Sequence, residues 1–354
     1  MIAFVLASYA PDTPAGIERA TAALAAGLRL RGHDTLIISA ATEAEAIVRL
    51  ESLRVTFPMD DRALRRAIET SSVSDEIAEI LDRHRADVVV YTDALWGLGR
   101  AMANHPARKV LAVHVVGHDE DLRPALSSAD TVIAPSVTVL REAARHDYET
   151  SAWQVVPNCL LYDEGAWLDQ HRRERVRAHG PVRVLARSAP EKGVAELLDH
   201  LPELDRRVEV LLARAPFEQP DGQNEEVLHR CLSVDAPFLQ VRRGGLAWRH
   251  VPSWLAQAAV VIVPSLAETF GLVALEAMNV GTPVVAYDIG NLPELIGNGG
   301  VIVKRDEGPY GLWQAAMTIT QDPITYLRTS RAAYYRSRDF RPTTVADIFL
   351  KAVR

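Results

Sequence analysis

Two glutamates, Glu268 and Glu276, stand eight positions apart directly behind an apolar strand expected at Val260–Val263. The first falls in the turn that leaves the strand, and the second lies about one turn inside the following helix. Ionised carboxylates accept hydrogen bonds from vicinal hydroxyls, and the unpaired N–H groups at a helix start attract phosphate. The pattern predicts a site for an anionic, polyhydroxylated ligand. On the spacing alone, a helix-start carboxylate and a solvated helix residue remain the alternative interpretation.

The segment from Pro264 to Glu276, with the downstream segments 277–286 and 290–294, resembles the nucleotide-sugar site of retaining GT-B glycosyltransferases of family four. The Glu-x7-Glu spacing is matched without a gap, and a Gly-Thr-Pro strand and a Gly-x-x-Pro-Glu turn follow in the same order. The resemblance implies that Glu276 holds the ribose hydroxyls and that Glu268 orients the donor sugar as a catalytic residue. It also implies donor contacts from the helix start, at Thr269, Phe270, Gly271 and Leu272.

Two cations, Arg187 and Lys192, follow a strand expected at Val182–Ala186 and are five positions apart. In the resembling family, residues with this spacing grip the donor pyrophosphate and act in catalysis. An arginine binds phosphate oxygens through its fork, and a lysine adds a point charge. The resemblance therefore implies that the nucleoside diphosphate leaves without a metal, and we expect no metal or cofactor. An ordinary exposed loop pair is the alternative.

Two glycine turns complete the expected donor site. Gly16, preceded by Ala15, resembles the family's glycine-rich turn into the first helix, where many members have two glycines. We therefore expect less room there, and a plain strand-to-helix connection remains open. Gly245 and Leu246 follow another strand, and the resemblance implies that this turn faces the nucleobase.

Histidine and aspartate side chains follow a strand expected at Lys109–Val115. His118 resembles the family histidine that faces the donor sugar, whereas His114, expected inside the strand, is the competing candidate. Either ring could instead be a structural hydrogen-bonding group. Asp119 and Asp121 form an Asp-x-Asp triplet, which binds a divalent metal in a different glycosyltransferase fold. We interpret the triplet here as a solvated loop.

The first half of the chain is expected to bind the acceptor. It has no strongly basic amphipathic helix, so we expect a small soluble acceptor, such as a natural-product or cyclitol core, and no membrane association. Loops after the expected strands supply the candidate acceptor-binding residues, which are Tyr9, Asp12, Asp93, His118 and Asp119.

Short apolar runs alternate with helical patterns along the whole chain, which predicts α/β domains with parallel sheets. We expect GT-B architecture, with two doubly wound Rossmann-like domains facing across a cleft. The expected boundaries are an acceptor domain at 1–165, a linker at 166–180, a nucleotide-sugar domain at 181–335, and a crossover helix at 336–354 that returns to the first domain. The remaining expected strands are 2–6, 35–39, 55–57, 87–91, 131–134, 154–156, 208–213, 238–241, 284–286 and 301–303. A capping Thr is expected to begin the terminal helix.

The composition further narrows the possible class of protein. The chain has 354 residues, 48% hydrophobic and 24% charged, with a formal net charge of −7, which argues against nucleic acid or an anionic bilayer as the main partner. Cys159 and Cys231 are far apart and form neither a disulfide framework nor a zinc site, so a reducing cytoplasm is expected. The apolar N-terminus predicts a buried strand and not a signal peptide. Abundant Arg and Ala indicate a bacterial source, and the oligomeric state is left open.

The sequence thus predicts a retaining, metal-independent hexosyltransferase that moves a sugar from a nucleoside diphosphate to an acceptor hydroxyl. A UDP-sugar is favoured, and a GDP-sugar is possible. Two other classes stay open, namely a nucleotide-sugar epimerase or hydrolase of the same fold and a non-catalytic sugar-nucleotide-binding subunit. A dehydrogenase is disfavoured, because Met102 occupies the third glycine position behind Gly97 and Gly99.

Overall fold

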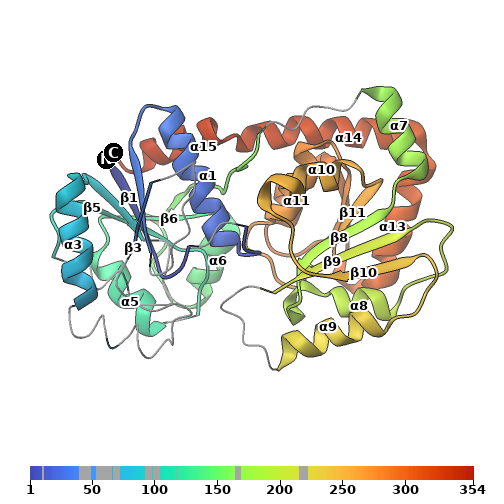
Figure 1. The fold of residues 1–354 in the computed structure, drawn as a ribbon, viewed down its shortest axis with the longest axis horizontal. Helices are drawn as coiled ribbons and strands as arrows, with labels where there is room; N and C mark the ends of the chain where they lie inside the picture. Colours follow the sequence, from blue (N-terminus) through green and yellow to red (C-terminus); the bar gives the residue numbers. More distant parts are fainter. Residues whose placement is uncertain are drawn as a thin grey trace. The chain divides into compact units, whose positions relative to one another are not determined.

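The computed structural model describes residues 1–9, 12–39, 49–52, 66, 72–91, 98, 104–117, 119–163, 169–214 and 222–354. The chain divides into two compact units (Figure 1). Unit 1 contains Met1–Pro11, Ala15–Leu161 and Phe340–Arg354, and unit 2 contains Asp12–Pro14 and Tyr162–Asp339.

The described strands of unit 1 form a seven-stranded parallel sheet in the order β3-β2-β1-β4-β5-β6-β7. The interior strand β1 is buried along its whole length, as expected for a parallel sheet covered on both faces. The strands are β1 (Ile2–Leu6), β2 (Thr35–Ser39), β3 (Arg49–Ser52), β4 (Val88–Tyr91), β5 (Arg108–Ala112), β6 (Thr131–Ala134) and β7 (Gln154–Val155).

Helices cover both faces of this sheet (Figure 1). One face packs in a core with α3 (Ser72–His84), α5 (Asp119–Ser128) and α6 (Val137–Arg145). The other carries α1 (Gly16–Leu30), which packs against α15 (Pro342–Ala352).

The last helix confirms the expected return to the first domain. A Cβ atom on Gly27 of α1 would lie 2.3 Å from the carbonyl oxygen of Pro342, so the two helices approach closely there. Arg31 also forms an ion pair with Asp347 of α15. The expected capping threonine is wrong, because Arg341 is the N-cap residue and makes no side-chain cap bond.

The described strands of unit 2 form a six-stranded parallel sheet in the order β10-β9-β8-β11-β12-β13. In both sheets the order reverses beside the first strand, between β1 and β4 and between β8 and β11. The strands are β8 (Val182–Arg187), β9 (Val208–Ala213), β10 (Leu239–Arg243), β11 (Val260–Val263), β12 (Val284–Tyr287) and β13 (Gly300–Val303).

Helices also cover both faces of the unit 2 sheet. One face packs with α8 (Val194–Asp199), α9 (Gln223–Ser233) and α13 (Gly308–Gln321). Opposite them, α11 (Leu272–Asn279) packs against α10 (Val251–Ala256), α12 (Leu292–Ile296) and α14 (Pro323–Ser337). The remaining short turns are η1 (Pro190–Lys192), η2 (Trp248–His250), η3 (Gly297–Gly299), η4 (Arg305–Glu307) and η5 (Arg338–Phe340).

Helix α7 (Gln170–His179) occupies most of the segment expected as a linker, and it belongs to unit 2. Its side chains are polar except for Val176 and Ala178, so no apolar periodicity marks it in the sequence. Arg173 is nevertheless completely buried and donates hydrogen bonds to the Val280 carbonyl, at 2.5 Å, and to Thr282 Oγ1, at 3.2 Å. The helix is therefore held by buried polar contacts and not by an apolar stripe.

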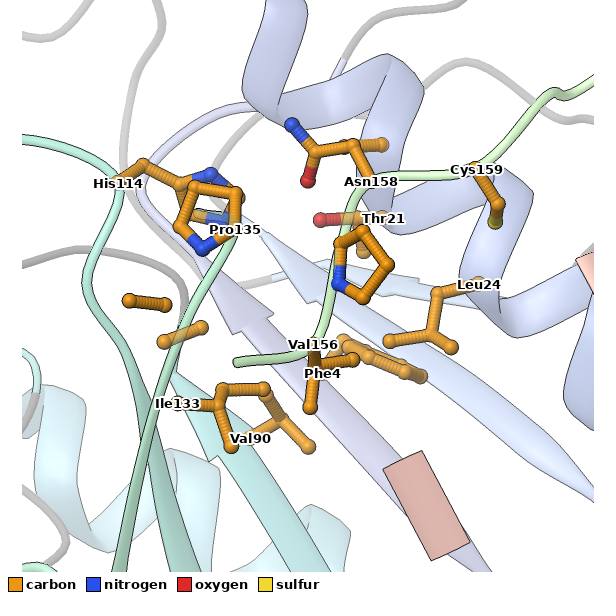
Figure 2. Close-up of a pocket in the computed structure, with 14 residues that line it drawn as sticks. Phe4, Thr21, Leu24, Val90, His114, Ile133, Pro135, Val156, Asn158 and Cys159 are labelled. Carbon is orange, nitrogen blue, oxygen red and sulfur yellow. The ribbon is translucent and has the colours of Figure 1, made fainter. Parts of the chain in front are cut away.

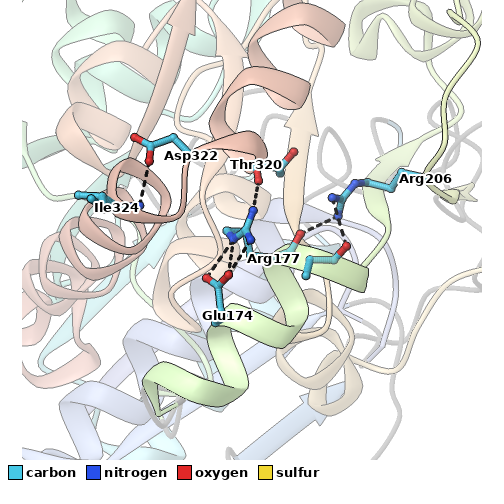
Figure 3. A network of polar contacts seen from close by, with 7 residues as sticks. Glu174, Arg177, Arg206, Thr320, Asp322 and Ile324 are labelled. Carbon is cyan, nitrogen blue, oxygen red and sulfur yellow. Dashed lines mark hydrogen bonds and ion pairs between the residues drawn. The ribbon is translucent and has the colours of Figure 1, made fainter.

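Further polar contacts fix the C-terminal half of α7 (Figure 3). The Arg177 guanidinium binds the Glu174 carboxylate and the Thr320 carbonyl. Arg206 donates to the carbonyl oxygens of Arg177, at 2.9 Å, and of Gly180, at 2.7 Å. Because the last carbonyls of a helix lack intrahelical donors, Arg206 completes the end of α7.

Candidate functional site

The expected donor residues lie at the switch point of the unit 2 sheet. Arg187 is the last residue of β8, and Glu268 follows the adjacent strand β11. Doubly wound sheets bind ligands beyond the carboxyl ends of their strands, where the strand order reverses. The sequence therefore places its charged residues at the edge that this topology favours for binding.

Lys192 and Glu268 are in direct contact at this edge. Lys192 Nζ donates to Glu268 Oε2 at 2.9 Å, and the two side chains are 19% and 16% exposed. Ser265 Oγ donates to the same oxygen at 3.4 Å. Two donors on one oxygen fix the orientation of the carboxylate, and the contact joins residues that are 76 positions apart.

Glu191 holds the second cation. Its carboxylate accepts from Arg187 Nη2 at 2.8 Å, and its carbonyl oxygen accepts from the N–H of Leu266, also at 2.8 Å. Gly193 has φ of 66°, and a Cβ atom there would lie 2.1 Å from the Pro264 carbonyl oxygen. The turn that carries both cations is thus packed against the loop that carries Glu268.

The downstream Gly-x-x-Pro-Glu segment fixes the other side of that loop. The Asn291 N–H donates to the Glu268 carbonyl at 3.3 Å, and Asn291 Nδ2 donates to the Phe270 carbonyl at 3.1 Å. Gly290 has φ of 58°, and a Cβ atom there would lie 1.8 Å from the Glu268 carbonyl oxygen. Only glycine fits this position without moving the loop.

Helix α11 begins at Leu272, and its N-cap residue, Gly271, has φ of 105° and no side-chain cap. The N-cap residue therefore offers no side-chain acceptor to the N–H groups of the first turn, which suits an anion. Thr269 is half-buried and Phe270 is buried just before this turn. Glu276, in the fifth position of α11, is 7% exposed, so the alternative interpretation of a solvated helix residue is wrong.

The turn after β10 carries Gly245 and Leu246, and Gly245 lies beside the end of β9. Gly245 is exposed, and the nearest atom to a Cβ atom built on it would be Ala213 Cβ, at 3.8 Å. Leu246 is half-buried.

Asp12 was expected to bind the acceptor, but it groups with unit 2. Its φ is 64°, and its carboxylate accepts a hydrogen bond from the N–H of Trp248. The Trp248 indole Nε1 donates to the Thr13 carbonyl at 2.7 Å. The structure therefore places the Asp12 side chain on a backbone donor of unit 2.

The other expected residues of the first half lie in unit 1 or outside the described residues. Gly16 is exposed and begins α1. Tyr9 is completely buried. His118 and Asp93 lie outside the described residues.

His114 does not lie inside a strand as expected, because β5 ends at Ala112. It lies in the segment that leaves the carboxyl end of β5, where burial lowers the pKa of its ring to about 4. The ring is therefore neutral near pH 7, with one donor nitrogen and one acceptor nitrogen.

Asp119 opens helix α5, so the expectation of a solvated loop there is wrong. Its carboxylate accepts from the Tyr148 hydroxyl, and from Arg123 at 3.2 Å. The Tyr148 hydrogen bond chiefly lowers the pKa of Asp119, while burial and Asp119 raise the pKa of Tyr148 to about 12. Asp121 is 1% exposed. Within the described part of the chain, no cluster of three or more His, Cys, Asp or Glu side chains could hold a metal ion.

Three supporting residues were not singled out from the sequence, namely Glu191, Ser265 and Asn291. Glu191 directly precedes Lys192, and Asn291 directly follows Gly290 inside the recognised turn. Their positions beside motif residues were the available signal, but spacing alone does not show which side chains meet.

Two family models match the two halves of the chain. Residues 14–160 match the family described as Glycosyltransferase Family 4, and residues 182–322 match Glycosyl transferases group 1. Solved structures share the architecture over nearly the whole chain. The Anabaena protein HepE in complex with UDP-glucose has a TM-score of 0.78 at 18% identity, covering 100% of this chain and 99% of that one. Sucrose-phosphate synthase from Thermosynechococcus elongatus has a TM-score of 0.77 at 17% identity, covering 99% and 97%.

The two doubly wound units, with a glycine-capped helix start and paired charges at a strand switch point, have the GT-B fold. The chain belongs to the glycosyltransferases of family 4.

Curated relatives include two proteins named D-inositol 3-phosphate glycosyltransferase. The one from Streptomyces scabiei is 26% identical over 297 residues, 73% of this chain and 64% of the relative. The one from Kribbella flavida is 36% identical over 172 residues, 46% of this chain and 39% of the relative. The chain therefore spans less than two-thirds of the length of these relatives. Among the described residues, no helix combines the length and apolar character needed to cross a bilayer.

Proposed function

We propose that this protein is a retaining glycosyltransferase that moves a sugar from a nucleoside diphosphate to a hydroxyl group of a small soluble acceptor. The contact between Lys192 and Glu268 carries the proposal, because it joins a phosphate-binding cation to a sugar-binding carboxylate at the start of α11. Unit 2 binds the donor, and unit 1 binds the acceptor.

The donor diphosphate lies against the first turn of α11, with Arg187 and Lys192 beside it. An ammonium group has three donors and a guanidinium group has five, so each can hold a carboxylate and a phosphate oxygen together. As the bond between the sugar and the diphosphate breaks, these cations and the helix N–H groups stabilise the charge that develops on the phosphate. Such preorganised donors supply electrostatic catalysis without a metal.

The two carboxylates hold the hydroxyl groups of the donor. Glu276 accepts from the ribose, and Glu268 accepts from the transferred sugar. Lys192 and Ser265 both occupy Oε2 of Glu268, so Oε1 is the oxygen directed to the sugar. With no nucleophile assigned, the leaving phosphate oxygen takes the acceptor proton on the same face, which retains the anomeric configuration.

A UDP-sugar is the favoured donor and a cyclitol or its phosphate is the favoured acceptor class. Similar solved structures contain UDP or UDP-glucose, and the curated relatives are named for D-inositol 3-phosphate. A reducing cytoplasm suits such soluble substrates and the two free buried cysteines, Cys159 and Cys231.

A thermal-shift screen of UDP, GDP and ADP tests donor binding first, since a ligand at 100 times its Kd stabilises the fold by about 2.7 kcal/mol. UDP is expected to raise the melting temperature most. Incubation with UDP-glucose and inositol phosphate, followed by NMR of the anomeric proton, then tests transfer. An α-linked product supports retention, and a β-linked product contradicts it.

Incubation with the donor alone separates the other enzyme class. Isomerised or rapidly hydrolysed UDP-glucose, with no acceptor product, would replace the proposal by an epimerase or a hydrolase. Strong binding without turnover would favour a binding subunit. Activity is expected to survive chelation, and a loss restored by manganese would contradict metal independence.

A further inference from the structure

A small cavity lies inside unit 1, between helix α1 and the carboxyl half of the sheet (Figure 2). Its volume is about 30 Å³. The walls come from four strands, from one face of α1 and from the segment 156–159 that follows β7. At one end of the view, the lining is apolar, with Phe4, Val90 and Ile133.

The other end of the cavity is polar. Figure 2 shows His114, Asn158 and Thr21 together there, from three separate parts of the chain. Thr21 is 3% exposed, and its Oγ1 has no hydrogen-bond partner among the described residues. A buried hydroxyl in this state is unfavourable, because it has lost its hydrogen bonds to water.

The neighbouring groups can both donate and accept hydrogen bonds without carrying charge. His114 is neutral, as described above, so it has one donor and one acceptor nitrogen. Asn158 has an amide oxygen and an amide NH₂ group. Burial raises the pKa of Cys159, which also lines the cavity, so this side chain stays a thiol.

We propose that Thr21 is a positioning residue for His114, acting through water held at the polar end of this cavity. One water requires roughly 10–15 Å³ of such volume and two to four polar partners. A cavity of about 30 Å³ lined by Thr21, His114 and Asn158 meets both conditions.

This water sets which nitrogen of His114 carries the proton. A ring nitrogen that accepts from a held water leaves the proton on the other nitrogen, so the hydrogen-bonding character of the opposite edge is fixed. Water-mediated bonds of this kind are nearly as favourable as direct ones. The effect on the reaction rate rests on the proposed function and also requires that His114, the competing candidate to His118, is the histidine that faces the donor sugar. The effect on the tautomer of the His114 ring does not depend on the proposed function.

The test replaces the hydroxyl and measures the ring. Thr21→Val removes Oγ1 and keeps the branched shape. Thr35→Val is the matched control, because Thr35 is 4% exposed, its Oγ1 also has no partner among the described residues, and it does not line the cavity. Thr21→Ser keeps the hydroxyl and removes the methyl group, so it separates the loss of the hydroxyl from a change in side-chain shape. Thr21→Ala also removes the hydroxyl and repeats the test if the valine protein folds poorly.

The readout is NMR of ¹⁵N-histidine-labelled full-length protein, with the His114 signals assigned by their loss in His114→Gln. The native protein and the Thr35→Val and Thr21→Ser variants are expected to show one His114 tautomer. Thr21→Val is expected to show a second tautomer and a turnover about three- to tenfold lower, the scale of one hydrogen bond, with an unchanged KM for the donor.

An unchanged His114 tautomer in Thr21→Val would overturn the proposal. So would a tautomer change in Thr35→Val, which would make the effect non-specific. A changed tautomer with unchanged turnover would uphold the positioning of His114 and contradict its part in the proposed function. The two ideas therefore fail through different measurements.

Discussion

The sheets of units 1 and 2 have the same order over six strands, and unit 1 adds β7 at one edge, but the described residues at their switch points differ in chemistry. Unit 2 places two ion pairs there, Arg187 with Glu191 and Lys192 with Glu268, and glycines hold the surrounding backbone in close contact. Beside its own switch point, unit 1 has a small cavity and one neutral histidine. The comparison teaches that the scaffold supplies a location, and that the strand-end loops decide whether it suits an anion.

The substitution Lys192→Ala is expected to have the largest effect on the charged site of unit 2. The variant loses the cation that we propose stabilises the departing diphosphate, and kcat is expected to fall by about 100-fold or more, the scale of one lost oxyanion donor. Lys304→Ala, at an exposed position of unit 2, is the control. Steady-state kinetics with both purified proteins decides the matter, and full activity in the Lys192 variant would remove this residue from the mechanism.

Gly290→Ala tests whether backbone packing holds the charged site. The added methyl carbon would lie 1.8 Å from the Glu268 carbonyl oxygen, so the Glu268 loop must move. We expect a loss of about 3 kcal/mol in the free energy of unfolding and weaker nucleotide binding.

Gly308→Ala is the matched control for this change. Gly308 has φ of 62°, close to the 58° of Gly290, but no atom lies within 4 Å of its added Cβ position. Gly308→Ala is expected to lower the free energy of unfolding by only about 1 kcal/mol, through backbone strain. Denaturant unfolding compares the two, and equal losses would show that steric contact with Glu268 is unimportant.

The substitution Glu276→Gln distinguishes the roles expected for the two carboxylates of unit 2, Glu276 and Glu268. Because Glu276 is expected to hold the ribose, the Kd values for UDP and for UDP-glucose should both rise about tenfold, the scale of one hydrogen bond to a charged group. Glu268→Gln should weaken binding of UDP-glucose more than that of UDP. Calorimetric titration with both ligands checks this, and the reverse pattern would exchange the two assignments.

The smallest expected effect lies in unit 1. Tyr148→Phe removes the hydrogen bond that chiefly lowers the pKa of Asp119. A lowered carboxyl pKa contributes stability above the ordinary carboxyl range, and that contribution disappears as the pH falls. The raised pKa of Tyr148, about 12, contributes stability that disappears as the pH rises above about 10.

The melting temperature of Tyr148→Phe should therefore be slightly below that of the native protein at neutral pH and should approach it in acid. Tyr310→Phe is the control, because Tyr310 is 68% exposed. A gap between Tyr148→Phe and native protein that is constant from pH 3 to pH 8 would contradict the role of Asp119.

The sequence predicted most strands of the parallel sheets, because buried strands such as Val260–Val263 are short and continuously apolar. It missed β3 (Arg49–Ser52), whose sequence is largely polar, and the strand expected at 55–57 lies outside the described residues. The sequence also placed Glu268 and Glu276 correctly on a turn and a helix, since the strand and the glycine define where α11 begins. A side chain's partners do not follow from such local signals. The contact of Lys192 with Glu268 depends on two strands that are adjacent only in the folded sheet.

Helix α7 and the position of His114 show where sequence patterns fail. Helix α7 has no apolar stripe, and its buried Arg173 is stabilised by carbonyl and hydroxyl groups more than 100 residues away. The apolar run 110–116 suggested a strand up to Val115, but pairing with β6 extends only through Ala112. The length of the apolar run therefore overestimated the length of β5. It placed His114 inside this strand, although His114 follows it.

The return of α15 to unit 1 also has a consequence for synthesis on the ribosome. Unit 1 needs residues 340–354 to cover α1, yet these emerge only after all of unit 2 has been translated. During synthesis, unit 1 therefore remains incompletely folded at a stage when unit 2 can already fold. This order differs from the usual N-terminal-first sequence of cotranslational folding, because the first unit cannot be completed before the second has been synthesised.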